Sequence, residues 1–281
     1  MSALKAVIST AGFGTRFFPV GKSVNKAMLP ILNRPVVDYL VSECVQAGVT
    51  EIGLVVMVGD TQLRGYFTED RTLKDYFFSR GWEEKYRPLE HLHTQAEFTF
   101  IEQSLDGRYG TAIPAMLAQE FVGDADFFLL TGDDLVLRGD GGCDLAELRD
   151  ACDEAGAAGG IAVTEVAPEH ISRYGIISTR PYGSVEVLDG AVEKPAPEDA
   201  PSNLASISRF LLTPAIFKYL EALRPDARTG EYLSISALLD YAQDHPVLVH
   251  RITGDYHDCG SIGGWLDANV AAAAQLDDDS A

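Results

Sequence analysis

The sequence predicts an α/β protein with parallel strands in its central sheet, because its first 58 residues have the pattern of a βαβ unit. An apolar run at residues 3–9 stops at a glycine-rich turn, as a short buried strand does. Residues 34–47 carry apolar side chains at helical spacing and are followed by Gly48, which suits the position after a helix. Residues 51–58 are apolar, β-branched and too few for a core helix, so they predict a second strand.

The rest of the chain continues this alternation after one irregular segment. Residues 61–95 are aromatic and charged, and we expect a partly helical excursion from the sheet whose aromatic side chains are buried. Short apolar runs predict strands at residues 98–102, 126–131, 160–166, 175–179, 184–192, 204–212 and 247–252. Apolar residues at helical spacing predict helices at 111–121, 143–156, 214–223 and 232–243. A last helix and an acidic tail fill 262–281, so residues 1–281 form one predicted domain.

Composition excludes several classes of function. The 281 residues include 22 Lys and Arg against 42 Asp and Glu, a net charge of −20. This balance argues against binding to nucleic acid, which needs a basic surface, and against docking on an anionic membrane. No signal peptide or membrane-spanning run is found, and the four cysteines are scattered without a CxxC pair. We therefore expect a cytoplasmic protein without disulfides or a zinc site.

The first chemical signal is the loop Ala11-Gly12-Phe13-Gly14-Thr15-Arg16, followed by Lys22 and Lys26. Glycines directly after a strand let backbone N–H groups approach a phosphate chain, although an ordinary tight turn also explains two glycines. The loop is no Rossmann fingerprint, because Phe17 stands where the third glycine belongs, and no G-K-[ST] of a P-loop follows. Three cations beside the glycines of an acidic chain favour a nucleoside triphosphate.

A family resemblance starts at this loop. Residues 11–39, AGFGTRFFPVGKSVNKAMLPILNRPVVDY, resemble the signature of the sugar-phosphate nucleotidyltransferases. They are most similar to the bacterial UTP–glucose-1-phosphate uridylyltransferases, whose pattern is AGxGTRxxPxTKxxPKEMLP. Further likenesses follow in order at LTGDD (130–134), RYGII (173–177), VEKP (192–195) and YHDCG (256–260). The resemblance implies a Rossmann-like nucleotide-diphospho-sugar transferase fold, with a mixed, mainly parallel central sheet flanked by helices and the nucleotide over the strand C-termini.

The resemblance also assigns a metal pair. It implies that Asp133 and Asp258 bind Mg²⁺, with Asp134 as a weaker candidate. Magnesium needs only a few protein oxygens besides the substrate phosphates, so two Asp residues from distant loops suffice. Asp133 follows an apolar strand, where a carboxylate suits a cleft, but a turn cap explains an Asp-Asp pair equally well.

The remaining assignments concern the sugar phosphate and the base. By resemblance, Lys194 binds the phosphate of the sugar 1-phosphate, Glu193 binds sugar hydroxyls, and Gly175 brings backbone close to the hexose; in isolation a strand-end lysine is usually only solvated. Gln103 offers a donor and an acceptor to the imide edge of uracil or thymine. Gly110 would let the backbone pass close to the base, and it also suits a helix N-terminus.

The reaction implied is UTP + α-D-glucose 1-phosphate giving UDP-glucose and pyrophosphate, with Mg²⁺ as cofactor. Arg16 and Lys26 would be catalytic residues that hold the triphosphate and stabilise the leaving pyrophosphate, and Lys194 would aim the sugar phosphate at the α-phosphorus. No covalent enzyme intermediate is needed, because the sugar phosphate is itself the nucleophile. We expect a homo-oligomer that acts on small molecules.

This sequence departs from the family pattern in two places. Gly21, Asn25 and Ala27 replace the usual Thr, Pro and acidic residue, and residues 232–236 replace most of the usual GEIQLTDA. The reaction type is therefore better supported than the base or the hexose. Two alternatives stay open: a pyrophosphorylase for another substrate, such as dTTP, and a catalytically silent regulatory paralogue that binds sugar nucleotides.

Overall fold

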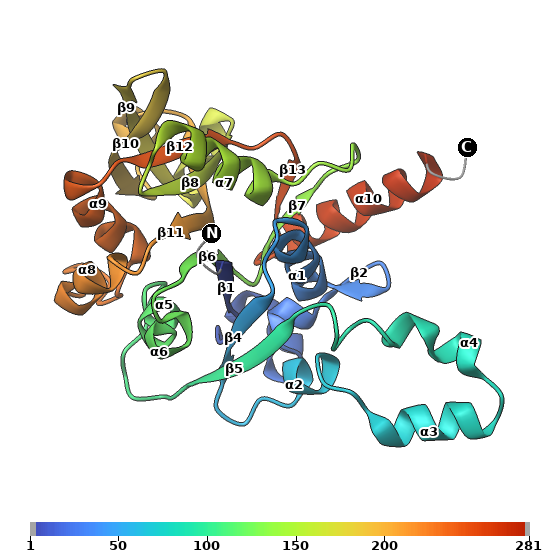
Figure 1. The fold of residues 1–281 in the computed structure, drawn as a ribbon. Helices are drawn as coiled ribbons and strands as arrows, with labels where there is room; N and C mark the ends of the chain where they lie inside the picture. Colours follow the sequence, from blue (N-terminus) through green and yellow to red (C-terminus); the bar gives the residue numbers. More distant parts are fainter. Residues whose placement is uncertain (1–3, 279–281) are drawn as a thin grey trace.

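The structure, a computed structural model, describes residues 4–278, so the part of the predicted acidic tail from Asp279 on lies outside the described residues. Within this range a mixed sheet of nine strands forms the centre of the molecule (Figure 1). Its strands are β1 (Leu4–Ser9), β4 (Glu51–Met57), β5 (Glu97–Gln103), β6 (Asp126–Thr131), β8 (Gly159–Glu165), β9 (Gly175–Tyr182), β10 (Val185–Glu193), β11 (Leu204–Leu212) and β12 (Val247–Arg251).

The strand order is β5-β4-β1-β6-β11-β8-β12-β10-β9. The first four strands in this order pair in parallel, as do β8 and β12, whereas β11 runs antiparallel between β6 and β8. The chain leaves β1 toward β4 and later returns to the other side of β1 as β6. This reversal between β1 and β6 is a topological switch point, where the loops after two parallel strands open a crevice.

Helices cover both faces of the sheet, which confirms the α/β class. Helices α1 (Val36–Gln46), α7 (Asp144–Ala155) and α10 (Ile262–Asp278) contribute to one apolar cluster. Helices α5 (Ile113–Leu117), α8 (Ile216–Ala222) and α9 (Ser234–Asp244) contribute to another. The predicted helix at 111–121 is broken at Ala118, after which α6 (Gln119–Val122) begins. None of the helices described is long and apolar enough to cross a membrane.

The excursion after β4 is partly helical, as predicted, with α2 (Gln62–Tyr66), α3 (Arg71–Ser79) and α4 (Glu83–Tyr86). Figure 1 shows α3 and α4 extending away from the sheet. The expected burial of the aromatic side chains is wrong in part, because Tyr76, Phe78 and Trp82 are 49%, 41% and 37% exposed. These rings pack against one another and under cations of the same arm instead of entering the core.

Two short antiparallel pairs were not expected from the sequence. Strand β7 (Asp134–Leu137) pairs with β13 (Asp255–Asp258), and β2 (Pro30–Ile31) pairs with β3 (Arg34–Pro35). In the first pair Asp134 lies opposite Asp258, although more than a hundred residues separate them. This pairing brings the end of β13 to the loop that follows β6.

Candidate active site

A cavity of about 370 Å³ opens where β1 and β6 end. Ser9 and Thr131 are opposite each other in the two strands, and the Gly132 N–H donates to the Ser9 carbonyl at 2.8 Å, so the two loops start side by side. Most residues predicted for the site line this cavity: Gly12, Gly14, Thr15, Arg16, Lys26, Asp133, Gly175, Glu193, Lys194 and Asp258. Ala11, Gln103 and Gly110 are not part of the lining.

The glycine loop wraps around Lys26. Gly14 has a φ of +61° at the start of a short 3₁₀ helix over Thr15–Phe17, a conformation that favours glycine. A Cβ on Gly12 would lie 3.2 Å from Lys26 Cε, so the bare glycine lets the lysine stem pass. The loop and Lys26 therefore line the cavity together.

The two predicted metal ligands converge. The Asp133 carboxylate accepts from the Lys26 ammonium at 2.6 Å, and both side chains are largely buried. A Cβ added to Gly260 would lie 2.3 Å from Asp133 Oδ2 and 3.0 Å from Asp258 Oδ1, so both carboxylates border the same small gap. Carboxylate oxygens that face one gap beside a substrate-sized cavity are the donor set that Mg²⁺ uses.

Asp134 has a different role from its neighbour. The Tyr256 hydroxyl donates to one of its carboxylate oxygens at 2.5 Å, and the Thr131 hydroxyl donates to the other. Burial, together with the charge of Asp133, raises the pKa of Asp134 to about 6. Because both oxygens are engaged, Asp134 ties the loop after β6 to β13 rather than offering a free metal ligand.

A buried cation contacts the start of β7, directly after the same loop. Arg209 of β11 is fully buried, and its Nη2 donates to the Glu43 carboxylate at 2.7 Å and to the Asp134 carbonyl at 3.1 Å. Nothing in the sequence pointed to this contact, since Arg209 lies within an apolar strand and Glu43 within a helix.

The residues predicted to bind the sugar phosphate lie where β9 and β10 pair. Gly175 lies opposite Glu193, and a Cβ on Gly175 would lie 3.0 Å from Glu193 Oε2. Lys194 has a φ of +48°, its N–H donates to the Tyr174 carbonyl at 3.1 Å, and its ammonium lies 3.2 Å from Glu193 Oε1. A lysine held in the left-handed region beside a cavity is the kind of strain that marks functional sites.

Arg173 was missed by the sequence analysis. It lines the cavity, and its guanidinium lies 3.5 Å from the Asp258 carboxylate. With Arg16, Lys26 and Lys194 it brings cations into one cavity of a chain with a net charge of −20. Lys22, the other loop cation, is exposed and is not part of the lining.

The departures from the family pattern have local structural reasons. A Cβ on Gly21 would lie 2.5 Å from the Gly14 carbonyl oxygen, so the backbone approaches too closely for a side chain. The Asn25 side chain accepts from the Ala27 N–H at 2.9 Å and donates to the Thr10 carbonyl at 2.8 Å. Ala27 is fully buried. These residues stabilise the loop that presents Lys26.

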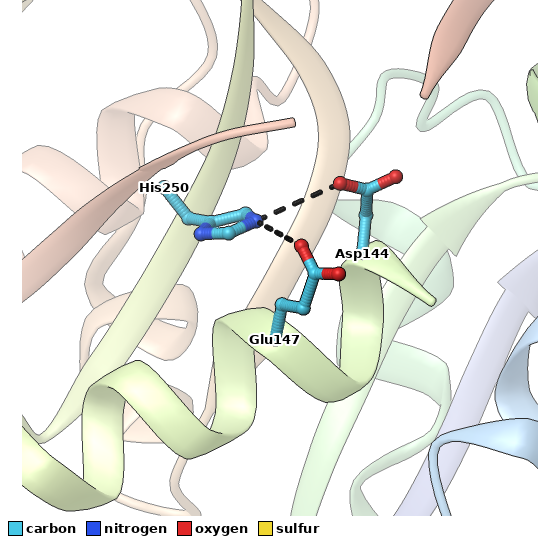
Figure 2. A group of neighbouring side chains, drawn as sticks. All are labelled: Asp144, Glu147 and His250. Atoms are coloured by element: carbon cyan, nitrogen blue, oxygen red, sulfur yellow. Dashed lines mark ion pairs between the residues drawn. The ribbon is translucent and has the colours of Figure 1, made fainter. Parts of the chain in front are cut away.

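A second group of ionisable residues lies on α7 and β12, where Asp144, Glu147 and His250 face one another (Figure 2). His250 Nε2 lies 3.7 Å from Asp144 Oδ1 and 3.8 Å from Glu147 Oε2. Arg138 already pairs with both carboxylates, at 3.2 and 3.1 Å. The Thr253 and Gly254 N–H groups also donate to the two carboxylate oxygens of Asp144, at 2.7 and 3.2 Å. Because both oxygens of Asp144 are engaged, we interpret the group as a structural ion-pair network.

We expect Asp144→Asn to lower the free energy of unfolding at pH 7 by about 3 kcal/mol, because it leaves Arg138 without a buried partner. Burial alone would raise the pKa of Asp144, but the nearby His250 imidazole, the hydrogen bond from the Thr253 N–H and the Arg138 guanidinium lower it to about 2. The contribution is therefore complete above about pH 4 and is lost as the pH falls toward 2.

Urea unfolding checks this prediction, with Asp140→Asn as the control. Asp140 binds the same guanidinium, but its side chain is 59% exposed, so this variant should change stability far less. Asp144→Asn should also keep the wild-type kcat. Equal stability losses in the two variants would contradict the structural role.

Cations and carboxylates gathered in one cavity at the switch point of a sheet suit transfer between phosphates. The family model described as "Nucleotidyl transferase" matches residues 5–275. A UTP–glucose-1-phosphate uridylyltransferase of Pseudomonas aeruginosa is 34% identical over 265 residues, 94% of each chain. The chain belongs to the nucleotidyl transferase family and is an enzyme of that class.

Solved structures agree in fold over nearly the whole chain. One, described as UDP-glucose pyrophosphorylase complexed with UDP-glucose, superposes with a TM-score of 0.86 at 29% identity, covering 97% of this chain and 99% of that one. Another, a UTP-bound UGPase from Acinetobacter baumannii, has a TM-score of 0.84 at 30% identity, covering 96% and 93%. The predicted resemblance and fold class are thus confirmed.

Proposed function

We propose that this enzyme transfers the uridylyl group of UTP to α-D-glucose 1-phosphate, which gives UDP-glucose and pyrophosphate. The observation that carries the proposal is that residues from two distant parts of the sheet line one cavity. Gly12, Arg16 and Lys26 come from the segment after β1, whereas Gly175, Glu193 and Lys194 come from β9, β10 and the residue that follows β10. The names of the relatives support the same pair of substrates.

Asp133 and Asp258 would hold Mg²⁺ in the same cavity. The fit rests on the gap at Gly260, which both carboxylates border and which any side chain would fill. Bound Mg²⁺ neutralises phosphate charge as a Lewis acid. The chain itself would hold the two carboxylates in place. Asp134, the neighbour of Asp133, accepts from the Tyr256 hydroxyl of β13, and its carbonyl accepts from the buried Arg209.

In the reaction, the phosphate oxygen of the sugar phosphate attacks the α-phosphorus, and pyrophosphate leaves. Lys194 would hold the attacking phosphate, and Lys26 and Arg16 would bind the triphosphate and stabilise the departing charge. Holding both substrates in one cavity makes a bimolecular step effectively unimolecular, because the reacting groups are already in place. No nucleophilic side chain is required.

Gln103 and Gly110 would bind the uracil base. Gln103 Oε1 is buried and has no hydrogen-bond partner among the described residues, which suits an acceptor reserved for the imide N–H. Gly110 is needed for packing in any case, because a Cβ there would lie 2.3 Å from the Tyr232 carbonyl oxygen. Its proposed contact with the base therefore rests on its place near Thr111 of the lining.

We propose that the enzyme works in the cytoplasm as a homo-oligomer. The four cysteines are all free and buried, which suits a reducing compartment. Ile262, Leu266 and Val270 form an exposed apolar stripe on α10 that a second copy could cover. Light scattering of the purified protein at low micromolar concentration measures the oligomeric state.

A substrate panel tests the proposed function. Each of UTP, dTTP, ATP, CTP and GTP is combined with glucose, galactose, mannose and glucosamine 1-phosphate, and pyrophosphate release is measured. We expect UTP with glucose 1-phosphate to be the best pair. We also expect loose rejection of close analogues, because the apolar Leu233 and Ile235 of the altered segment line the cavity and discriminate weakly. A higher rate with another nucleotide or sugar 1-phosphate would show that UTP and glucose 1-phosphate are not the preferred substrates.

The same panel separates the regulatory alternative. A catalytically silent paralogue would bind UDP-glucose in a calorimeter and release no pyrophosphate with any pair. The presence of Lys26, Asp133, Lys194 and Asp258 in one cavity favours the enzyme.

A further inference from the structure

Two serines of β11 lie in the cavity without an assigned role. Ser206, Ser208 and Phe210 alternate along the strand and all contribute to the lining. Ile207 and Arg209, on the opposite face, are buried. The strand therefore presents two hydroxyl groups to the substrates.

The register of β11 places these hydroxyls between the sugar side and the metal loop. Ala205 pairs with Ile176 in an antiparallel ladder, which puts Ser206 beside Gly175. At the other end Arg209 pairs with Leu130, which puts Ser208 beside the Thr131 end of β6. The glycine loop that holds the triphosphate follows β1, one strand farther away.

The backbone of β11 is irregular at Ser208. The ladder between β11 and β8 is irregular between Ser206 and Phe210, and Ser208 has a φ of +53°. A left-handed residue inside a strand favours glycine, yet a serine stands here. Both serines are half-buried, and within residues 4–278 neither hydroxyl has a hydrogen-bond partner. Half-buried hydroxyls in a substrate cavity suit a polar ligand.

We propose that Ser206 and Ser208 are specificity-determining residues that hydrogen-bond the hexose hydroxyls of the sugar 1-phosphate. The inference rests on the proposed function. It adds two residues that would bind the sugar from β11, whereas Glu193 would bind it from β10. A serine hydroxyl can donate or accept a hydrogen bond, as a sugar hydroxyl can, so each serine can bind a sugar hydroxyl in either role. Position relative to Gly175 favours the hexose over the nucleotide phosphates.

Three variants test the proposal: Ser206→Ala, Ser208→Ala and Ser208→Gly. Calorimetry measures binding of UDP-glucose and of UTP, and steady-state kinetics measures KM for glucose 1-phosphate. We expect each variant to weaken UDP-glucose binding and raise the sugar-phosphate KM about three- to tenfold, with UTP binding within about twofold of wild type. Turnover of galactose 1-phosphate relative to glucose 1-phosphate should rise.

Two comparisons separate hydroxyl contact from backbone strain. Ser208→Ala loses the hydroxyl but keeps the Cβ, which is unfavourable at a positive φ. Ser208→Gly loses both the hydroxyl and the Cβ, so only the glycine variant should raise the melting temperature. Ser178→Ala, on the neighbouring strand β9 and not part of the lining, is the control and should bind as wild type does.

The outcomes are distinguishable. Unchanged UDP-glucose binding in the alanine variants would overturn the proposal, as would weakened UTP binding with an unchanged sugar-phosphate KM. A wild-type protein that binds UDP-glucose without turnover would contradict the proposed reaction, while the binding data would still decide the role of the serines.

Discussion

Asp133→Asn and Asp258→Asn are each expected to lower kcat about 100- to 1000-fold or more while the protein stays folded. Each substitution removes one of the two carboxylates that border the gap at Gly260, and with it the charge that Mg²⁺ requires. Rates with saturating UTP and glucose 1-phosphate, measured over a series of Mg²⁺ concentrations, check the prediction. Circular dichroism and thermal unfolding report whether the fold is kept.

The matched control is Asp255→Asn. Asp255 begins the same strand that Asp258 ends, but it is exposed and is not part of the cavity lining. The control should retain nearly full activity. Activity near that of the wild type in either Asp133→Asn or Asp258→Asn, at saturating Mg²⁺, would be incompatible with the metal assignment.

Lys26→Ala and Lys194→Ala should damage different halves of the reaction. Each would lose its proposed charge-assisted phosphate contact, worth about 1.5–3 kcal/mol or roughly 10- to 100-fold, and more if the contact strengthens in the transition state. Lys26→Ala should mainly raise the KM for UTP and lower kcat, whereas Lys194→Ala should mainly affect glucose 1-phosphate. Steady-state kinetics with each substrate varied in turn gives the answer.

Lys22→Ala serves as the control for charge alone, because this lysine belongs to the same loop but is exposed and is not part of the lining. Its kinetic constants should stay close to those of the wild type. If Lys194→Ala changed only the dependence on UTP, the proposed assignment of Lys194 to the sugar phosphate would be wrong. Lys26→Ala also leaves Asp133 without its 2.6 Å partner, so its Mg²⁺ dependence should be recorded too.

The sequence predicted the parts of this site that depend on short motifs. Asp133, Lys194 and the glycine loop each follow a strand directly, so a local pattern places them at the edge of the sheet. Their convergence in one cavity also depends on β7 and β13, whose pairing was not predicted because each strand has only four residues.

Contacts between distant residues could not be predicted from the sequence. The buried pair of Arg209 and Glu43 joins residues 166 apart, and no local pattern marks either as a partner. The positive φ of Ser208 has no signal either, since the residue is not a glycine. The aromatic side chains of Tyr76, Phe78 and Trp82 misled the prediction in the other direction, because their hydrophobicity predicts burial but these rings remain partly exposed on the arm.

The most direct test of the account is the exchange of labelled pyrophosphate into UTP. With Mg²⁺, glucose 1-phosphate and UDP-glucose present, we expect rapid appearance of label in UTP, because the proposed reaction runs in both directions. With the sugar compounds left out, we expect no exchange, because the sugar phosphate attacks directly and no uridylyl-enzyme forms. Exchange without any sugar compound, or none with both present, would contradict direct uridylyl transfer in this cavity.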